Sequence, residues 1–232
     1  MKRTVLLAAL AAALLLSSCG TAAAAQSSAA QPASSQSAAA SQSSAESAAP
    51  AALTAEQIKK ANDALGPTLA TSSDPSALNP AGIFLMQYYD SPKDLKLPEL
   101  LAYFPSEQTV TDADEFKALK AEASWPFGAD STLSSMPVPI HKIPAADVDA
   151  ALKKYMNISL SDLTIPANSA DLIYLKQYDA FYNFTSDANF GQFTCTGGEV
   201  EGDTVRLFSN DSTLCFHKSG DNYYFYSYQA AK

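Results

Sequence analysis

Hydrophobic and polar positions divide the 232-residue chain into three unequal parts. Val5–Leu16 is an unbroken apolar run that follows the cations Lys2 and Arg3. Thr21–Ala52 consists almost entirely of Ala, Ser, Gln and Pro, and only Leu53–Lys232 mixes apolar, aromatic and charged residues as a folded domain does. The apolar run is shorter than the about 20 residues that a transmembrane helix needs, and it has the shape of the apolar region of a signal peptide.

The sequence at the end of the apolar run, Leu16-Ser17-Ser18-Cys19, resembles the lipobox of bacterial lipoproteins. This resemblance implies cleavage before Cys19 and attachment of lipid to its sulfur through a thioether. Residues 1–18 are then a signal peptide, and the mature chain is held on the lipid bilayer through acylated Cys19. Two acyl chains give stable anchoring where one is marginal. Ordinary secretion with cleavage in Ala22–Ala25 and an uncleaved anchor stay open as alternatives. The lipobox favours a protein anchored to the cell membrane and facing its extracytoplasmic side.

Residues 19–52 contain this cysteine and a linker. Between Thr21 and Ala52 the only charged residue is Glu46, and there is no aromatic residue. Such a segment cannot bury enough apolar surface to offset its loss of conformational entropy, so we expect a disordered tether. A chain of this length has a mean reach of about 30 Å and a stretched reach of roughly 100 Å. Residues 53–232 then form one domain, which is long enough for a full core.

The first half of this domain has helical patterns. Thr54 and Gln57 are spaced as a capping box, and apolar residues at helical spacing follow as far as Gly66-Pro67. Ile83–Tyr89 is a short apolar run, for which we favour a buried helix over a strand because it shows no alternation. Further helices are predicted over Leu97–Phe104, over Asp112–Ala123 with Thr111 as its cap, and over Ala145–Met156.

The second half of the domain has the short runs of β-strands. Ile140–Ile143 is extended between two prolines, and Leu172–Leu175 is a strand. Four more strands, joined by turn residues, are predicted as a meander over Gly191–Thr196, Thr204–Phe208, Thr213–Lys218 and Tyr223–Tyr228. Helices first and strands afterwards predict an α+β fold, in which N-terminal helices pack on a C-terminal antiparallel β-meander sheet.

The chain is acidic, with a formal net charge of −9. Removal of Lys2 and Arg3 with the signal peptide makes the mature chain more negative still, at −11. An acidic surface argues against nucleic acid as a partner and against charge-driven docking on anionic lipid. Acidity by itself indicates solubility, and it points to no particular function.

Two cysteines, Cys195 and Cys215, remain after Cys19 is assigned to lipid. Disulfides persist outside the cytoplasm, so an even pair in an exported domain raises the question of a bridge. In a simple meander one strand separates the two residues, which places them about 9–10 Å apart, too far for a disulfide without curling of the sheet. We therefore favour two buried thiols over a disulfide.

Candidate catalytic and metal chemistry is sparse in the sequence. The only histidines are His141 and His217, and neither has the spacing of a metal or nucleophile motif. His217 shares a predicted strand face with Cys215, but such a pair is more often half-buried sheet surface than a zinc site. Thr196-Gly197-Gly198-Glu199 lacks the helix and the Lys-Ser/Thr end of a phosphate loop, which favours a hairpin turn. We predict no catalytic residue, no metal site and no cofactor.

Aromatic residues are the strongest candidates for recognition. They gather in Tyr178–Phe184 and Tyr223–Tyr228, while Trp125 and Phe127 lie in an irregular segment, where functional residues concentrate. The alternative is that these rings form the core and the cross-strand ladders of the sheet. The candidate binding residues are Trp125, Phe127, Tyr182, Tyr224, Tyr226 and Tyr228.

Several stretches of the domain resemble uncharacterised lipoproteins of clostridial Gram-positive bacteria. The matching stretches are Trp125-Pro126-Phe127-Gly128-Ala129-Asp130, Ser135-Met136-Pro137-Val138-Pro139-Ile140-His141, residues 178–187 and Gly202-Asp203-Thr204-Val205-Arg206-Leu207. The resemblance covers most of Leu53–Lys232 and is consistent with a tethered lipoprotein, but it implies no activity and no site.

The first functional hypothesis is a non-enzymatic binding or scaffold lipoprotein that engages a cell-wall glycan, peptide or protein through an aromatic patch. One alternative is a small extracytoplasmic hydrolase or wall-modifying enzyme whose acids come from separated segments. Another is an accessory subunit of a transport or export system. The domain is too small for a usual two-lobed solute-binding protein.

Overall fold

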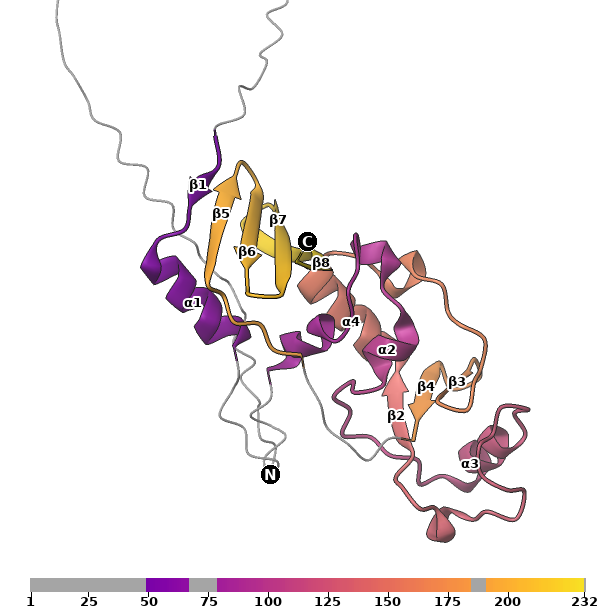
Figure 1. Cartoon of the computed structure of the whole chain (residues 1–232). Coiled ribbons are helices and arrows are strands. Elements are labelled where there is room, and N and C mark those ends of the chain that lie inside the picture. The colour runs from indigo at the N-terminus through magenta and orange to yellow at the C-terminus, as the bar shows by residue number, and fades with distance from the viewer. Residues whose placement is uncertain (1–48, 67–78, 185–190, 232) are drawn as a thin grey trace, which may run out of the picture.

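The computed structural model describes residues 49–66, 79–184 and 191–231 (Figure 1). They form the mixed α+β fold that the sequence predicts, with two antiparallel sheets. The predictions for the signal peptide, Cys19 and most of the linker lie outside the described residues. Within the described part of the chain, every helix is too short or too polar to cross a bilayer.

The larger sheet has five strands in the order β1-β5-β6-β7-β8, and its last four strands form a meander in which β6, β7 and β8 correspond to predicted strands. Gly202 and Gly220 lie in its two-residue turns, with φ of +57° and +60°. Residues with a Cβ rarely adopt this backbone conformation. The strand bounds are β1 Ala51–Ala52, β5 Gly197–Glu201, β6 Thr204–Phe208, β7 Ser212–Ser219 and β8 Asn222–Ala230.

The prediction for the first meander strand is wrong. Residues 191–196 are not a strand, and Gly197 and Gly198 lie in β5 rather than in a hairpin turn. Packing explains the glycine, because a Cβ at Gly198 would lie 2.4 Å from the Arg206 carbonyl oxygen and 2.6 Å from Leu53 Cδ1. The glycine therefore permits a close approach of chains inside a strand, where the sequence pattern alone indicates a turn.

The smaller sheet has three strands in the order β2-β4-β3. They are β2 (His141–Pro144), β3 (Leu172–Leu175) and β4 (Ala180–Asn183), which confirms the two strands predicted before the meander. All four residues of the central strand β4 are buried. This sheet is packed on both faces, because Phe181 and Ile143 belong to one hydrophobic cluster, and Tyr182 and Ile173 belong to the other.

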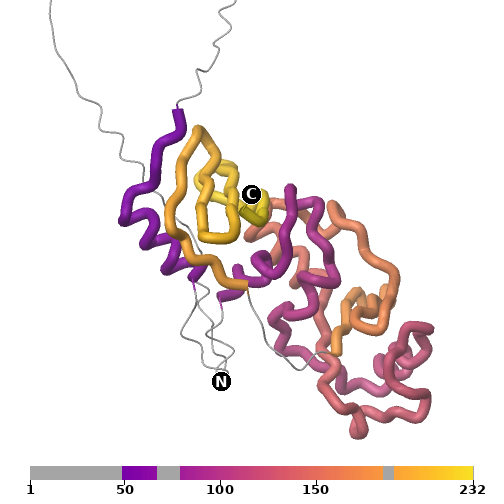
Figure 2. The backbone as a smooth tube through the Cα atoms, viewed as in Figure 1, coloured from indigo at the N-terminus to yellow at the C-terminus, as the bar shows by residue number. Residues whose placement is uncertain are grey.

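Helix α4 (Ala145–Met156) connects the two sheets. It contacts both β8 and β2, and its buried Val148 and Leu152 lie in the main core with Phe84 and Phe225. Helix α1 (Ala55–Leu65) lies beside β5 (Figure 1), and its Asn62 side chain exchanges two hydrogen bonds with the Cys195 backbone. Figure 2 shows that the backbone of α3 (Ala113–Lys120) and of the three-stranded sheet lies at the end of the molecule away from the five-stranded sheet, and α4 lies between the two sheets.

Four of the predicted helices are present, with corrections at their ends. The buried helix favoured for Ile83–Tyr89 is wrong, because a 3₁₀ turn ends at Leu85 and Tyr89 pairs with Tyr228 in an isolated β-bridge. The capping box of Thr54 and Gln57 is confirmed, and α4 has its predicted bounds. Helix α2 covers only Leu97–Leu101, and α3 covers Ala113–Lys120. Asp112, not Thr111, caps α3, because its carboxylate accepts a hydrogen bond from the Glu115 amide at 2.8 Å. Short 3₁₀ turns lie at Pro80–Leu85, Pro92–Asp94, Leu133–Ser135 and Leu160–Asp162.

Candidate functional site

Two of the predicted binding residues are buried, which corrects their assignment to a recognition surface. Tyr182 is 0% exposed, because β4 is covered on both faces, and its hydroxyl donates a hydrogen bond to the Glu115 carboxylate. Tyr228 is also buried and packs against Phe193, with ring centroids 6.3 Å apart. Neither ring can reach a ligand on the surface of the described structure.

Trp125 and Phe127 form a cluster with Phe184 at the edge of the smaller core. The three rings meet edge to face, with centroids 5.3–5.6 Å apart, a geometry that aromatic pairs favour. Trp125 also packs on Phe116 of α3, and its indole nitrogen donates a hydrogen bond to Ser131 Oγ at 3.3 Å. All three side chains are half-buried. Their main contacts are with one another, so packing accounts for this cluster.

Tyr224 and Tyr226 lie on the opposite side of the meander from the main core, together with His217. The His217 and Tyr226 rings are stacked, with centroids 3.6 Å apart and planes only 17° from parallel. A β-bulge creates this stack, because β8 carries Tyr226 as an extra residue between the partners of Cys215 and Phe216. Tyr226 is 38% exposed, one of three large hydrophobic side chains among the described residues that are exposed to this degree.

The same side of the meander carries a charged group that the sequence analysis missed. Arg206 Nη1 lies 3.0 Å from Glu199 Oε1 and 2.8 Å from Glu201 Oε2, and all three side chains are about one-third exposed. Hydrogen bonds to Glu201 and then to Glu199 raise the pKa of Arg206, so the guanidinium stays charged. Glu199 and Glu201 are two positions apart on β5, so their side chains lie on the same face of the sheet. The turn at Gly202-Asp203 reverses the chain, and Arg206 then lies opposite Glu199. Because the sequence analysis placed a turn at residues 196–199, it could not align these residues.

We call this solvent-facing side of the five-stranded sheet the outer face. Val205 and Leu207 on β6 and Leu214 on β7 point to the main core. Because successive side chains of a strand point to opposite faces, the residues next to them in sequence point away from the core. The registers Glu199↔Arg206, Arg206↔Cys215 and His217↔Tyr224 connect the charged and aromatic groups across four strands. The outer face consists of Glu199, Glu201, Arg206, Cys215, His217, Tyr224 and Tyr226.

Cys195 and Cys215 are free, buried thiols, which is the alternative favoured from the sequence. Burial raises the pKa of both thiols, so they remain protonated and unreactive at neutral pH. Cys215 and His217 do share the outer face, but the ring of His217 is stacked on Tyr226. Within the described ranges, no group of three His, Cys, Asp or Glu side chains is arranged to hold a metal ion.

An ion pair with a buried carboxylate and a half-buried lysine lies at the smaller core. Lys142 Nζ is 2.7 Å from Glu115 Oε1, the same oxygen that accepts the Tyr182 hydroxyl, and Lys142 also lies over the Tyr178 ring. Burial and the hydrogen bond to Glu115 raise the pKa of Tyr182 well above its ordinary value. The Glu115 side chain is only 6% exposed, so this group stabilises the packing of α3 on β2 and β4 and is closed to a substrate.

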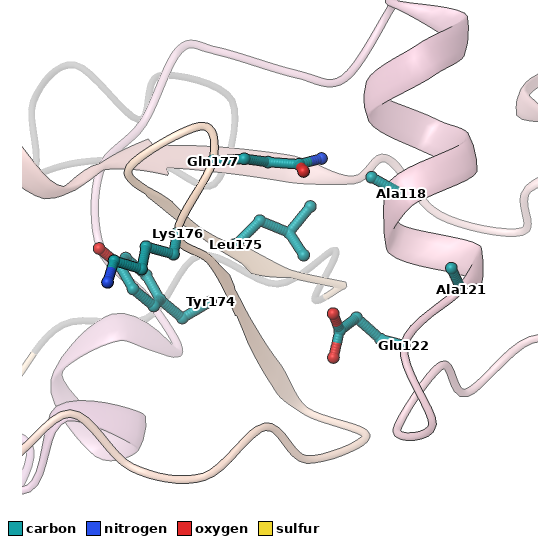
Figure 3. Close-up of a pocket in the computed structure, with 7 residues that line it drawn as sticks. All are labelled: Ala118, Ala121, Glu122, Tyr174, Leu175, Lys176 and Gln177. Atoms are coloured by element: carbon teal, nitrogen blue, oxygen red, sulfur yellow. The ribbon is translucent and has the colours of Figure 1, made fainter.

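An open groove lies between the end of α3 and the β3–β4 turn (Figure 3). In Figure 3 the Leu175 side chain points towards Ala118, and Lys176 lies beside the Tyr174 ring, away from Glu122. Glu122 accepts a hydrogen bond from Asn168, and the Tyr174 hydroxyl donates one to Asp179 at 2.7 Å. Two polar groups of this groove, the Glu122 carboxylate and the Tyr174 hydroxyl, are thus engaged in holding loops.

Comparison with known proteins adds no relative: no family model, no curated protein and no solved structure matches the chain. The functional argument therefore depends on the residues themselves. Of the six candidate aromatic residues, Tyr224 and Tyr226 are the ones that the structure places on the outer face.

Proposed function

We propose that this protein is a membrane-tethered extracytoplasmic lipoprotein that binds a component of the cell wall without catalysing a reaction. The N-terminal sequence supports the location, because a short apolar run is followed by a lipobox-like Leu16-Ser17-Ser18-Cys19 and a linker with a single charge. On this proposal the signal peptide is removed, acylated Cys19 holds the chain on the bilayer, and the linker lets the domain reach into the wall.

The exposed, stacked pair of Tyr226 and His217 carries the proposal for binding. Single exposed apolar residues are ordinary, but here a β-bulge in a strand of the sheet holds a tyrosine ring flat against its neighbour, with part of its surface open to solvent. Rigid aromatic side chains of this kind contribute large contact areas at low entropic cost, as in many binding surfaces. The hydrolase and transport-accessory alternatives have no comparable observation in their favour among the described residues.

Two measurements test the proposal. Mass spectrometry of the chain isolated from its own membranes should find a diacylglycerol-modified Cys19 at the N-terminus, and Cys19→Ser should release the protein from the membrane. The released chain should sediment with isolated cell walls, and Tyr226→Ala should reduce the bound fraction by about tenfold, as expected for a central aromatic contact. An unmodified Cys19 with the signal peptide still attached would refute the location, and equal sedimentation of the variant would refute the binding surface.

A further inference from the structure

The charged and aromatic groups of the outer face are close enough to serve one ligand. Arg206 on β6 and Tyr226 on β8 are separated by the single strand β7, so their strands lie about 10 Å apart. His217 connects the two groups, because it lies two positions along β7 from Cys215, the direct partner of Arg206. This separation matches the length of two linked sugar rings.

The polar half of the outer face has a fixed geometry. Arg206 carries five N–H donors, and the Nη1 group that holds both glutamates supplies two of them. Three donors of Arg206 remain, and Glu199 and Glu201 each keep one carboxylate oxygen outside these two bonds. The outer face therefore offers acceptors on β5 and donors on β6, on the same side of the sheet as the stacked pair of His217 and Tyr226. Hydroxyl groups, which both donate and accept, suit such an array better than a purely anionic or purely cationic ligand does.

The net charge of the outer face and of the whole chain limits the class of ligand that the outer face can bind. The three charged side chains sum to −1, and the whole chain to −9, so the field around this face repels phosphate-bearing and other polyanionic wall polymers. A cationic ligand would compete with Arg206 for its two carboxylates. An uncharged chain of sugar rings avoids both costs, since its apolar ring faces can stack on Tyr226 and its hydroxyls can bond to the charged group.

We propose that the outer face is a binding site for an uncharged glycan chain, with Tyr226, stacked on His217, as its stacking platform and Glu199, Arg206 and Glu201 as its hydrogen-bonding end. This inference rests on the proposed function, because it names the ligand of the same surface. A wall peptide or a wall protein is the competing occupant, and the experiment separates these outcomes.

The test is a titration of the ¹⁵N-labelled Cys19→Ser chain with an uncharged β-linked tetramer of N-acetylglucosamine. The amides of β6, β7 and β8 should shift on binding, whereas those of β3 and β4 should not. Tyr226→Ala should weaken the affinity by about tenfold and Arg206→Met by about fivefold, as expected for an anchor and for a hydrogen-bonding side chain. Tyr88→Ala is the matched control, because Tyr88 is 53% exposed but packs at a tilt against Tyr228 rather than on the His217–Tyr226 stack, and the variant should bind as the parent does. Unchanged thermal unfolding of each variant verifies its fold.

The outcomes separate this inference from the proposed function. If cell walls bind through Tyr226 but the tetramer shifts no amide and Arg206→Met binds walls normally, the surface binds another ligand and the glycan inference is wrong. Loss of wall binding after protease treatment of the walls, but not after digestion of their glycan, would assign the surface to a protein and would also overturn the inference. If the protein does not bind walls at all, the proposed function fails with it.

Discussion

The two sheets use similar chemistry in opposite ways. In the three-stranded sheet, Lys142, Glu115 and Tyr182 form a cation–carboxylate–tyrosine group that is enclosed by α3 and the smaller core. In the five-stranded sheet, Arg206, its two glutamates and Tyr226 supply the same kinds of groups on a surface open to solvent. Residue type alone therefore does not distinguish a structural group from a candidate binding group. The difference between the two groups is that α3 covers the first, whereas solvent reaches the second.

The largest expected difference comes from the same substitution in the two sheets. Tyr182→Ala should lower the free energy of unfolding by about 4 kcal/mol, because it leaves a large cavity in a closed core. Tyr226→Ala should lower it by less than about 1 kcal/mol, since only one exposed stacking contact is lost. Urea denaturation of both variants measures this contrast. Equal losses would show that the two tyrosines are equally buried.

The next effect concerns the two types of ion pair. Lys142→Met should cost about 3 kcal/mol, because it leaves the Glu115 carboxylate buried without its cation. Lys153→Met removes a lysine from a largely exposed pair with Asp149 on α4 and should cost less than about 1 kcal/mol. Denaturation at neutral pH and at two salt concentrations provides the comparison. A loss from Lys142→Met as small as that from Lys153→Met would mean that solvent reaches Glu115.

The smallest effect, counted for one residue over one pH unit, is a dependence of stability on alkaline pH. Burial raises the pKa of Tyr89, and burial with the Glu115 hydrogen bond raises that of Tyr182. Because the unfolded tyrosines ionise near pH 10, stability should be constant below that pH and should fall above it by about 1.4 kcal/mol per pH unit for each residue.

Two tyrosine variants test this assignment. Tyr89→Phe should reduce the alkaline slope and cost little at pH 7, since its buried hydroxyl has no hydrogen-bond partner among the described residues. Tyr182→Phe should reduce the slope too, but it should destabilise the protein at pH 7 because Glu115 loses a donor. An alkaline slope that neither variant changes would assign the transition to other groups.

Much of the fold could be predicted because its signals are local. The capping box of Thr54 and Gln57, the bounds of α4 and the turns at Gly202 and Gly220 each depend on residues within a few positions. One failure was β5, where Gly197 and Gly198 have the local signature of a turn. Their role as strand residues depends on Leu53 and Arg206, which approach from elsewhere in the sequence.

The candidate site was predicted only in part, for the same reason. Tyr182 and Tyr226 both lie in aromatic-rich segments, and no neighbour in sequence distinguishes the buried ring from the exposed one. Their difference comes from α3, which covers one face of the smaller sheet. The pairing of Arg206 with Glu199 and Glu201 could have been found from the alternation of charges around Gly202-Asp203, once β5 had been placed correctly.

Strand β1 has a consequence for how neighbouring molecules behave. The side chains of Ala51 and Ala52 are exposed, but their backbone pairs with β5. The Leu53 amide continues this pairing with a hydrogen bond to the Gly198 carbonyl at 2.9 Å. An uncovered strand at that position invites other chains to add to the sheet. Residues 51–53 thus cover the open edge of the five-stranded sheet, and a shortened protein beginning at Thr54 should be prone to self-association.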